Sequence, residues 1–403
     1  MNSNKKILVI GSYPIMNPKH GGQKRTAAIV SEYKKHFSVK YVSVIPGDYY
    51  LDRKSADISI SRTLMQKIKT NPIFSDIICG QAISEDHKIK AKLLKIIKKY
   101  KPDIIQLEQP YMYIGLQSIL KENRLHPLII NSTHNIEANM KKDIYKSSGV
   151  DHKLATLYLR LIKDTERQLS LDAILSVAVS PFDAEYLKTK LQARNVILAP
   201  NGMNRLKFNH QLASSLQQKY KRERINHLAV FVGSAHQPNL QGFMSMVGKA
   251  IGFLPYDSRI VVIGGVSDLI SASMRPGVIE DVCFTERVCL LGTVNEALLA
   301  AYLYLANLII LPITDGGGSN LKTAEALLSG KHIVATSKAF RGYEDMIKLP
   351  QVHLADNPED FKSEIIKLLD SKPPELSDSQ NRLVDQVLWT NTLKDLIVRV
   401  GEL

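Results

Sequence analysis

Apolar and polar positions alternate along the chain in two successive series of short apolar runs and amphipathic segments. In the first series, apolar runs at 6–11, 39–44, 102–107, 128–132, 173–179 and 196–199 predict strands. Amphipathic stretches at 26–36, 88–100 and within 136–170 predict helices between them. Strands that alternate with helices indicate a parallel sheet with crossover helices.

A second series begins at residue 227. Its predicted strands are 228–233, 259–265, 288–291, 307–312 and 332–336, and its predicted helices lie around 242–250, at 295–305 and after 316–318. We take the polar, highly charged stretch at 204–226 as a linker. The predicted architecture is therefore α/β, with two Rossmann-like domains at 1–203 and 227–376 that face each other across a cleft. Helices at 377–403 follow and are candidates for crossing back to the first domain.

The composition is that of a soluble globular protein, with 44% hydrophobic and 23% charged residues in a chain of 403. No apolar run is long enough to span a bilayer, and the apolar N-terminal run is too short and strand-like for a signal peptide. The three cysteines, Cys79, Cys283 and Cys289, are scattered. They indicate neither a disulfide framework nor a metal site, so we expect a cytoplasmic protein without a structural metal.

The net charge of +14 is confined to the first half of the chain. Residues 1–200 contain 32 Lys and Arg against 18 Asp and Glu, whereas residues 201–403 contain 21 of each class. Such a field attracts anionic partners. In the stretch 88–100, lysines surround an apolar face. This pattern fits a core helix with a solvated face, or a surface that binds anionic lipid.

The stretch from 308 to 325 carries the most specific chemistry. A buried-strand pattern at 308–311 is followed by a short loop that contains Gly316, Gly317 and Gly318, and a helix pattern comes next. Glycines let the backbone approach a ligand, and helix N-termini bind phosphate groups. Glu325 would lie on that helix, where it could accept hydrogen bonds from ribose hydroxyls. The alternative is an ordinary strand–loop–helix joint with glycines for packing.

The motifs together resemble retaining glycosyltransferases of the GT-B fold, in the large family 4 (group 1). In the second half the resemblance rests on Phe231-Val232-Gly233-Ser234 with His236 and Asn239, Gly264-Gly265, Leu291-Gly292-Thr293-Val294 and the loop from Gly316 to Glu325. In the first half it rests on Gly21-Gly22, Thr133-His134-Asn135-Ile136-Glu137, Val179-Ser180 and Pro200-Asn201-Gly202.

The resemblance implies a hexosyltransferase-type enzyme that moves a sugar from a nucleotide-sugar donor to a glycan or lipid-linked acceptor, with retention and without a metal or cofactor. It implies donor binding by Gly233, Ser234, His236, Asn239, Thr293, Gly317, Gly318, Ser319, Asn320, Leu321, Lys322, Glu325 and Arg341. The acceptor or phosphate loop would comprise Gly21, Gly22, Lys24 and Arg25, and the catalytic candidates are His134 and Glu137.

The expected setting is cell-surface polysaccharide or glycoconjugate synthesis in the cytoplasm, with the inner face of the plasma membrane as a candidate surface for the basic first domain. His134 could instead be a histidine that caps a helix or is satisfied by the backbone. Glu137 could orient His134 or cap the helix. Gly21 and Gly22 could simply form a turn.

The sequence also departs from the family pattern. Many members have a glutamate where Gly317 stands, and Arg and Lys where Ser234 and His236 stand. The diphosphate charge would then fall to backbone N–H groups, Lys322 or Arg341. The donor identity stays open.

Two rival functions share parts of this evidence. A GT-B epimerase or phosphorylase would use the same cleft for other chemistry. A basic nucleic-acid-binding protein would account for the charge, but aromatic residues are not interleaved with the basic ones as such modules require, so we expect no nucleic-acid partner.

Overall fold

The computed structural model describes residues 5–46, 50, 57–61, 63–66, 72–275, 277–315 and 321–403. The chain divides into two compact units, Met1–Pro200 with Thr392–Leu403, and Asn201–Asn391. The segment 204–226, interpreted above as a linker, includes the helix α9 (His210–Arg222) and lies in the second unit. This helix packs against α13 (Glu296–Leu305) because its apolar side, including the buried Tyr220, faces that helix.

The first unit is built on a parallel sheet that has seven strands among the described residues. Their order is β3 (Ile58–Ser59), β2 (Ser38–Ile45), β1 (Lys6–Gly11), β4 (Ile104–Glu108), β5 (Leu128–Ser132), β6 (Leu175–Ala178) and β7 (Val196–Leu198). The chain order reverses between the neighbouring strands β1 and β4. Ligands of open α/β sheets bind at the carboxyl ends of the strands beside such a reversal.

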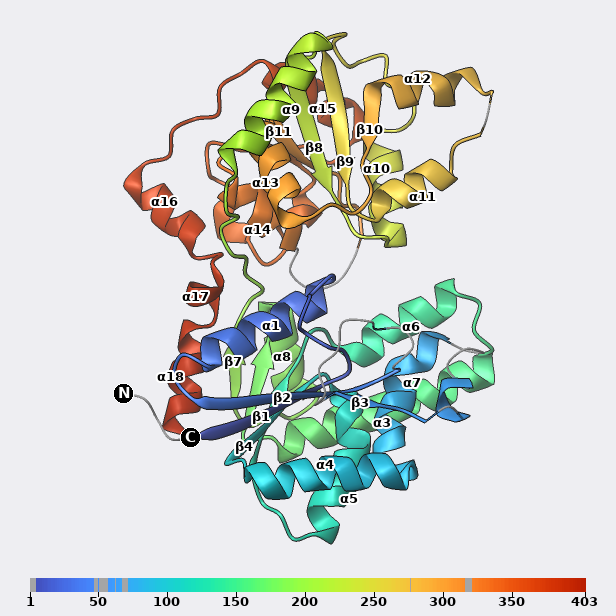
Figure 1. Ribbon diagram of the computed structural model, residues 1–403, viewed down its shortest axis with the longest axis vertical. Coiled ribbons are helices and arrows are strands. Elements are labelled where there is room, and N and C mark those ends of the chain that lie inside the picture. The colour runs from blue at the N-terminus through green and yellow to red at the C-terminus, as the bar shows by residue number, and fades with distance from the viewer. Residues whose placement is uncertain are drawn as a thin grey trace. The chain divides into compact units, whose positions relative to one another are not determined.

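Helices cover both faces of this sheet, with α1 on one side and α4 and α5 on the other (Figure 1). The helices are α1 (Gly21–Tyr33), α3 (Ser75–Glu85), α4 (His87–Tyr100), α5 (Tyr113–Glu122), α6 (Glu137–Ser147), α7 (His152–Asp172), α8 (Pro181–Thr189) and α18 (Lys394–Glu402). The single long helix predicted within 136–170 is two helices. Gly149 between them has φ 63°, a left-handed conformation that favours glycine and ends the helical path.

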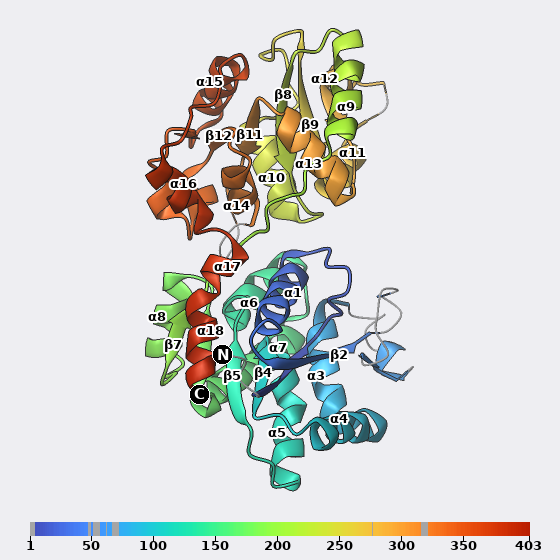
Figure 2. The same ribbon diagram turned by 60° about the vertical axis from the view of Figure 1, so that its left-hand side comes forward.

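The lysine-rich helix α4 has the amphipathic pattern that the sequence predicts. It buries Ile89, Leu93 and Ile97 and leaves most of its lysines exposed. Asp86 caps its N-terminus by accepting hydrogen bonds from two backbone N–H groups. At the other end of the chain, α18 lies beside β7 (Figure 2) and accepts two hydrogen bonds from the Lys5 ammonium through its carbonyls.

The second unit has a parallel sheet of six strands among the residues described. Their order is β10 (Val288–Leu290), β9 (Ser258–Ile263), β8 (His227–Val232), β11 (Leu308–Leu311), β12 (His332–Ala335) and β13 (Val352–Leu354). Here the reversal lies between β8 and β11. Predicted donor residues follow β8 (Gly233, Ser234 and His236), and others follow β10 (Thr293) and β12 (Arg341). All of these positions come after the carboxyl ends of parallel strands, which meet at one edge of the sheet.

Two apolar layers cover the faces of this second sheet. One contains Tyr220, Leu303 and Leu327, and the other contains Phe243 and Phe361. The first layer is supplied by α9, α13 and α14 (Leu321–Leu328), and the second by α10 (Gln237–Met246), α11 (Val266–Ala272), α12 (Ile279–Arg287) and α15 (Pro358–Leu369). The chain continues through α16 (Asp378–Asp385) and α17 (Trp389–Thr392).

Within the described ranges, no helix is both long and apolar enough to cross a membrane. In the same part of the chain, no three His, Cys, Asp or Glu side chains come close enough together to hold a metal ion.

Candidate active site

The first polar cluster lies at the carboxyl ends of β1, β4 and β5. Tyr13 follows β1, Glu108 is the last residue of β4, and His134 follows β5. His134 Nε2 lies 2.8 Å from Glu108 Oε2, and His134 Nδ1 lies 3.0 Å from the Tyr13 hydroxyl. His134 is 8% exposed. Protein groups thus engage both nitrogens of the candidate catalytic histidine, and these partners are a carboxylate and a phenol.

Glu108 is fully buried and holds this cluster together. Its carboxylate also accepts hydrogen bonds from Thr26 Oγ1 at 3.0 Å and from Gln106 Nε2 at 2.6 Å. Burial alone would raise the pKa of Glu108. The hydrogen bond with His134, the charge of Arg25 and the hydrogen bond from Gln106 lower the pKa of Glu108 below its ordinary value. The carboxylate is therefore ionised at neutral pH.

The first turn of α1, which contains Gly21 and Gly22, packs against the same cluster. His20 caps α1 in a capping box with Gln23, and Gly22 lies in the first turn. A Cβ atom at Gly22 would lie 2.6 Å from the Tyr13 hydroxyl oxygen and 3.2 Å from His134 Nδ1. The absence of a side chain at Gly22 is what lets Tyr13 and His134 meet beneath α1.

The basic residues after this loop differ in their exposure. Arg25 is 1% exposed, and its Nη1 donates to the Ala199 carbonyl at 2.8 Å. Arg25 therefore packs α1 against the end of the first unit through Ala199, and its role as an anion ligand stays a prediction. Lys24 is half-buried and Gly21 is exposed on the same turn.

Glu137, the second catalytic candidate, opens α6 and is 1% exposed. Its Oε2 accepts a hydrogen bond of 2.6 Å from Tyr111, and burial raises the pKa of its carboxyl. The cap of α6 is Glu166, which accepts hydrogen bonds from the backbone N–H groups of Glu137 and Ala138. Glu166, not Glu137, therefore caps the helix, and the carboxylate that bonds His134 is that of Glu108. A catalytic role for Glu137 stays a prediction.

In the second unit, the loop after β8 is joined to α14. Lys322 Nζ donates to Asn239 Oδ1 at 2.7 Å, and Asn239 Nδ2 donates to the Ser234 carbonyl at 2.9 Å. Burial lowers the pKa of Lys322 to about 8, although Glu325 opposes the shift. Burial also lowers the pKa of His236, with Lys322 contributing. A desolvated ammonium at a helix N-terminus is a favourable place for an anion.

Glycines let two loops pack closely beside this group. A Cβ atom at Gly264 would lie 2.3 Å from the Gly233 carbonyl oxygen, and Gly264 has φ 98°. Any larger residue at position 264 would push the β8 loop away. The Gly264–Gly265 pair of the sequence motif is thus explained by the approach of this loop to Gly233.

The remaining predicted donor residues occupy three different positions. Leu321 opens α14 and is half-buried, Thr293 is exposed beyond β10, and Arg341 is half-buried after the short helix Ser337–Phe340. Gly317, Gly318, Ser319 and Asn320 lie outside the described residues.

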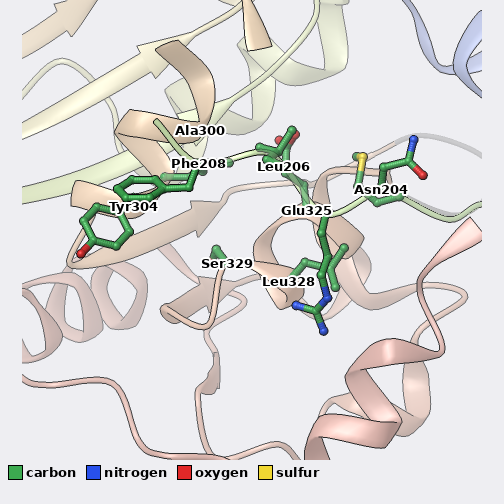
Figure 3. Close-up of a pocket in the computed structure, with 11 residues that line it drawn as sticks. Asn204, Leu206, Phe208, Ala300, Tyr304, Glu325, Leu328 and Ser329 are labelled. Atoms are coloured by element: carbon green, nitrogen blue, oxygen red, sulfur yellow. The ribbon is translucent and has the colours of Figure 1, made fainter. Parts of the chain in front are cut away.

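Glu325 lies on α14, is 7% exposed and lines a cavity of about 200 Å³. Figure 3 shows Phe208 and Tyr304 together on one side of this cavity, with Glu325 and Leu328 nearer its middle and Asn204 on the far side. The rings of Phe208 and Tyr304 are 4.1 Å apart between centroids. Glu325 therefore interacts with Lys322 and also lines a cavity whose walls are partly apolar.

Sequence reasoning missed several side chains that complete the two clusters. In the first unit these are Tyr13, Thr26, Gln106 and Glu108, and in the second Phe208 and Tyr304. Position at the end of β4 could have indicated Glu108, because that strand lies beside the reversal of chain order. The others depend on packing between distant segments.

Comparison with protein families identifies the second unit. Residues 226–371 match the family model described as "Glycosyl transferases group 1". This unit contains a group 1 glycosyltransferase domain. The chain is accordingly a transferase enzyme. None of the curated proteins compared matches it.

Solved structures extend the likeness in fold to the whole glycosyltransferase chain. Sucrose-phosphate synthase from Thermosynechococcus elongatus has a TM-score of 0.67 at 13% identity, covering 99% of this chain and 98% of its own. HepE from Anabaena in complex with UDP has a TM-score of 0.64 at 13% identity, and the match covers 99% of this chain and 100% of HepE. The catalytic domain of starch synthase IV from Arabidopsis thaliana, bound to ADP and acarbose, has a TM-score of 0.62 at 13% identity. The match covers 99% of this chain and 98% of that domain. The predicted α/β fold of the GT-B type is confirmed.

The contact at Gly22 generates a first prediction. In Gly22→Ala, the new methyl group displaces the Tyr13 hydroxyl and breaks its bond to His134. We expect a loss of about 1–3 kcal/mol in the free energy of unfolding, as for other overpacked sites. Urea denaturation measures this change. The matched control is Gly21→Ala, which adds the same methyl at an exposed position of the same turn and should be neutral or stabilising. Equal stability of the two variants would contradict the proposed contact.

Proposed function

We propose that the enzyme transfers a sugar, with retention of configuration, from a nucleotide-sugar donor to a glycan or lipid-linked acceptor, without a metal. The observation that carries this proposal is the match of residues 226–371 to group 1 glycosyltransferases, together with the ammonium of Lys322 and the carboxylate of Glu325 on α14. The pathway we propose is cell-surface polysaccharide or glycoconjugate synthesis.

Donor binding is assigned to the second unit. Anabaena HepE was solved with UDP and with UDP-glucose, and starch synthase IV with ADP, which supports a nucleoside diphosphate as the common element. In this chain Lys322 would face the diphosphate, whose charge offsets the cost of burying the ammonium. Glu325, one turn further along α14, would accept hydrogen bonds from the ribose.

Acceptor binding is assigned to the first unit, which holds the buried cluster around His134. Because the leaving diphosphate would be stabilised by Lys322, Arg341 and backbone N–H groups, no metal is needed in this scheme. Retention rests on the family resemblance. The polar groups at the ends of β1, β4 and β5 would orient the acceptor hydroxyl.

A thermal-shift panel of nucleoside diphosphates and their sugars tests the proposal, because a ligand that binds only the folded state raises its stability. We expect one base to raise the melting temperature more than the others, and release of free nucleoside diphosphate only when acceptor is present. Release without acceptor, or none with any donor, would favour the epimerase or phosphorylase alternative.

The ribose assignment predicts that Glu325→Ala weakens binding of the preferred nucleoside diphosphate by about 2–3 kcal/mol, the value of a charge-assisted hydrogen bond. Isothermal titration calorimetry measures this loss. Glu286→Ala is the matched control, since Glu286 is an exposed carboxylate on α12 of the same unit. If both variants bind like the native enzyme while remaining folded, Glu325 does not contact the ribose.

The buried ammonium predicts that nucleotide binding takes up protons. The free enzyme loses the Lys322 proton near pH 8, and a bound diphosphate would return the pKa towards its usual higher value. Affinity should therefore fall as the pH rises through 8. Calorimetry at pH 8 in two buffers of different ionisation enthalpy would show the uptake as a difference in heat. In Lys322→Arg, which stays charged, this difference should vanish; an equal difference in both proteins would exclude Lys322 as its source.

We also propose that the basic first unit binds the anionic inner face of the plasma membrane, where a lipid-linked acceptor would lie. The support is the net charge of residues 1–200 and the exposed lysines of α4. Each lysine near an anionic surface contributes about 1 kcal/mol.

The triple variant Lys88→Gln, Lys95→Gln, Lys99→Gln should therefore bind anionic liposomes on the order of 10²-fold more weakly than the native enzyme, by co-sedimentation at low salt. The control neutralises Lys219, Lys221 and Arg222, three exposed basic residues of α9 in the second unit. Native binding that is equal for anionic and neutral liposomes would exclude the membrane proposal and leave the transferase intact.

A further inference from the structure

The buried cluster of the first unit determines which nitrogen of His134 carries the proton. The hydrogen-bond chain begins at the side-chain amide of Gln106. Its Oε1 accepts a hydrogen bond of 2.8 Å from Tyr33, and its Nε2 lies 2.6 Å from Glu108 Oε1. An ionised carboxylate only accepts hydrogen bonds. The amide nitrogen of Gln106 must therefore face Glu108, and the orientation of this amide is fixed.

The same property of Glu108 fixes the imidazole. Glu108 Oε2 accepts from Thr26 Oγ1 at 3.0 Å, and His134 Nε2 lies 2.8 Å away. Because the carboxylate cannot donate, Nε2 carries the hydrogen. In the neutral ring Nδ1 then has a lone pair, which accepts the hydrogen of the Tyr13 hydroxyl at 3.0 Å.

The tautomer in turn sets the direction of the Tyr13 hydrogen bond. When the Tyr13 hydrogen points to Nδ1, the Tyr13 oxygen can only act as an acceptor towards its other neighbour, Thr26 Oγ1, at 3.5 Å. In the opposite tautomer Nδ1–H would donate to Tyr13, and the Tyr13 hydrogen would point away from His134.

We propose that Gln106 and Glu108 are positioning residues that hold His134 as its Nε2–H tautomer, and that sugar transfer depends on this tautomer, which sets the direction of the hydrogen bond between Tyr13 and His134. The proposal rests on the function proposed above. It assigns roles to three buried side chains, Gln106, Glu108 and Tyr13, that the motifs do not mark.

Glu108→Gln provides the decisive change, because it preserves shape. While the Tyr33 hydroxyl keeps donating to Gln106 Oε1, Gln106 presents its amide nitrogen to position 108. The new amide then turns its oxygen towards Gln106 and its NH₂ group towards His134 Nε2. That NH₂ group donates, and the ring must move its hydrogen to Nδ1. Loss of the matching carboxylate in a Ser–His–Asp triad lowers kcat through the wrong tautomer in the same way.

The double variant Gln106→Glu with Glu108→Gln reverses the effect. The carboxylate at 106 can still accept from Tyr33, and it also accepts from the amide nitrogen at 108. The amide oxygen at 108 then faces His134 Nε2 and restores the original tautomer. The net charge is that of the native chain.

The measurement is ¹⁵N NMR of the full chain, in which protonated and unprotonated imidazole nitrogens are well separated, with His134 assigned from the spectrum of His134→Asn. We expect Nε2–H in the native protein, Nδ1–H in Glu108→Gln and Nε2–H again in the double variant. Release of nucleoside diphosphate in the presence of acceptor should fall on the order of 10²–10³-fold in Glu108→Gln and recover in the double variant. Nucleoside diphosphate binding should stay unchanged, because it belongs to the second unit.

Glu32→Gln is the control, since it removes a buried carboxylate of α1 that is bonded to Lys35 and should leave both tautomer and turnover unchanged. Nε2–H in Glu108→Gln, or an inverted tautomer with native turnover, would overturn the proposal. Absence of transfer by the native protein with every donor would instead reject the proposed function, while the spectra would still decide the tautomer.

Discussion

A fully buried carboxylate is the constraint around which the first unit is arranged. Ionised Glu108 has no contact with solvent, and an uncompensated charge in such a place costs several kcal/mol. Hydrogen-bond donors must therefore converge on it, both from its own strand and from elements that are distant in sequence. Thr26 reaches it from α1, Gln106 from its own strand and His134 from the end of β5. Each donor ties one element to the reversal point of the sheet.

The second unit also encloses a charged group, but there the charge is positive. There the enclosed group is the ammonium of Lys322, which is bonded to a neutral amide oxygen and has Glu325 nearby. The balance is incomplete, as the lowered pKa of Lys322 shows. The carboxylate of the first unit is thus satisfied by protein donors, whereas the ammonium of the second retains a deficit that an anion would correct. This contrast suits a preformed acceptor side and a donor side completed by its ligand.

The sequence predicted the parts of the structure that depend on local pattern. Alternating apolar runs gave both parallel sheets, and the apolar face of α4 falls on Ile89, Leu93 and Ile97 as its spacing predicts. Several elements were missed, among them the short strands β3 and β13 and the helices α5, α9 and α15. A three-residue strand has too little periodicity to recognise, and the charged exposed face of α9 concealed its buried side, which includes Tyr220.

For the candidate sites, the sequence indicated strand ends but not the partners found there. His134 was predicted because the segment 133–137 resembles the one that carries the active-site histidine in the family. Its bonds to Glu108 and Tyr13 join segments 26 and 121 residues away, and no local pattern records such pairs. Arg25 was predicted to bind an anion because it follows two glycines. Its side chain is enclosed, and it donates a hydrogen bond to the Ala199 carbonyl. Residue type shows which chemistry is available at a strand end, and long-range packing decides whether that group serves the ligand or the fold.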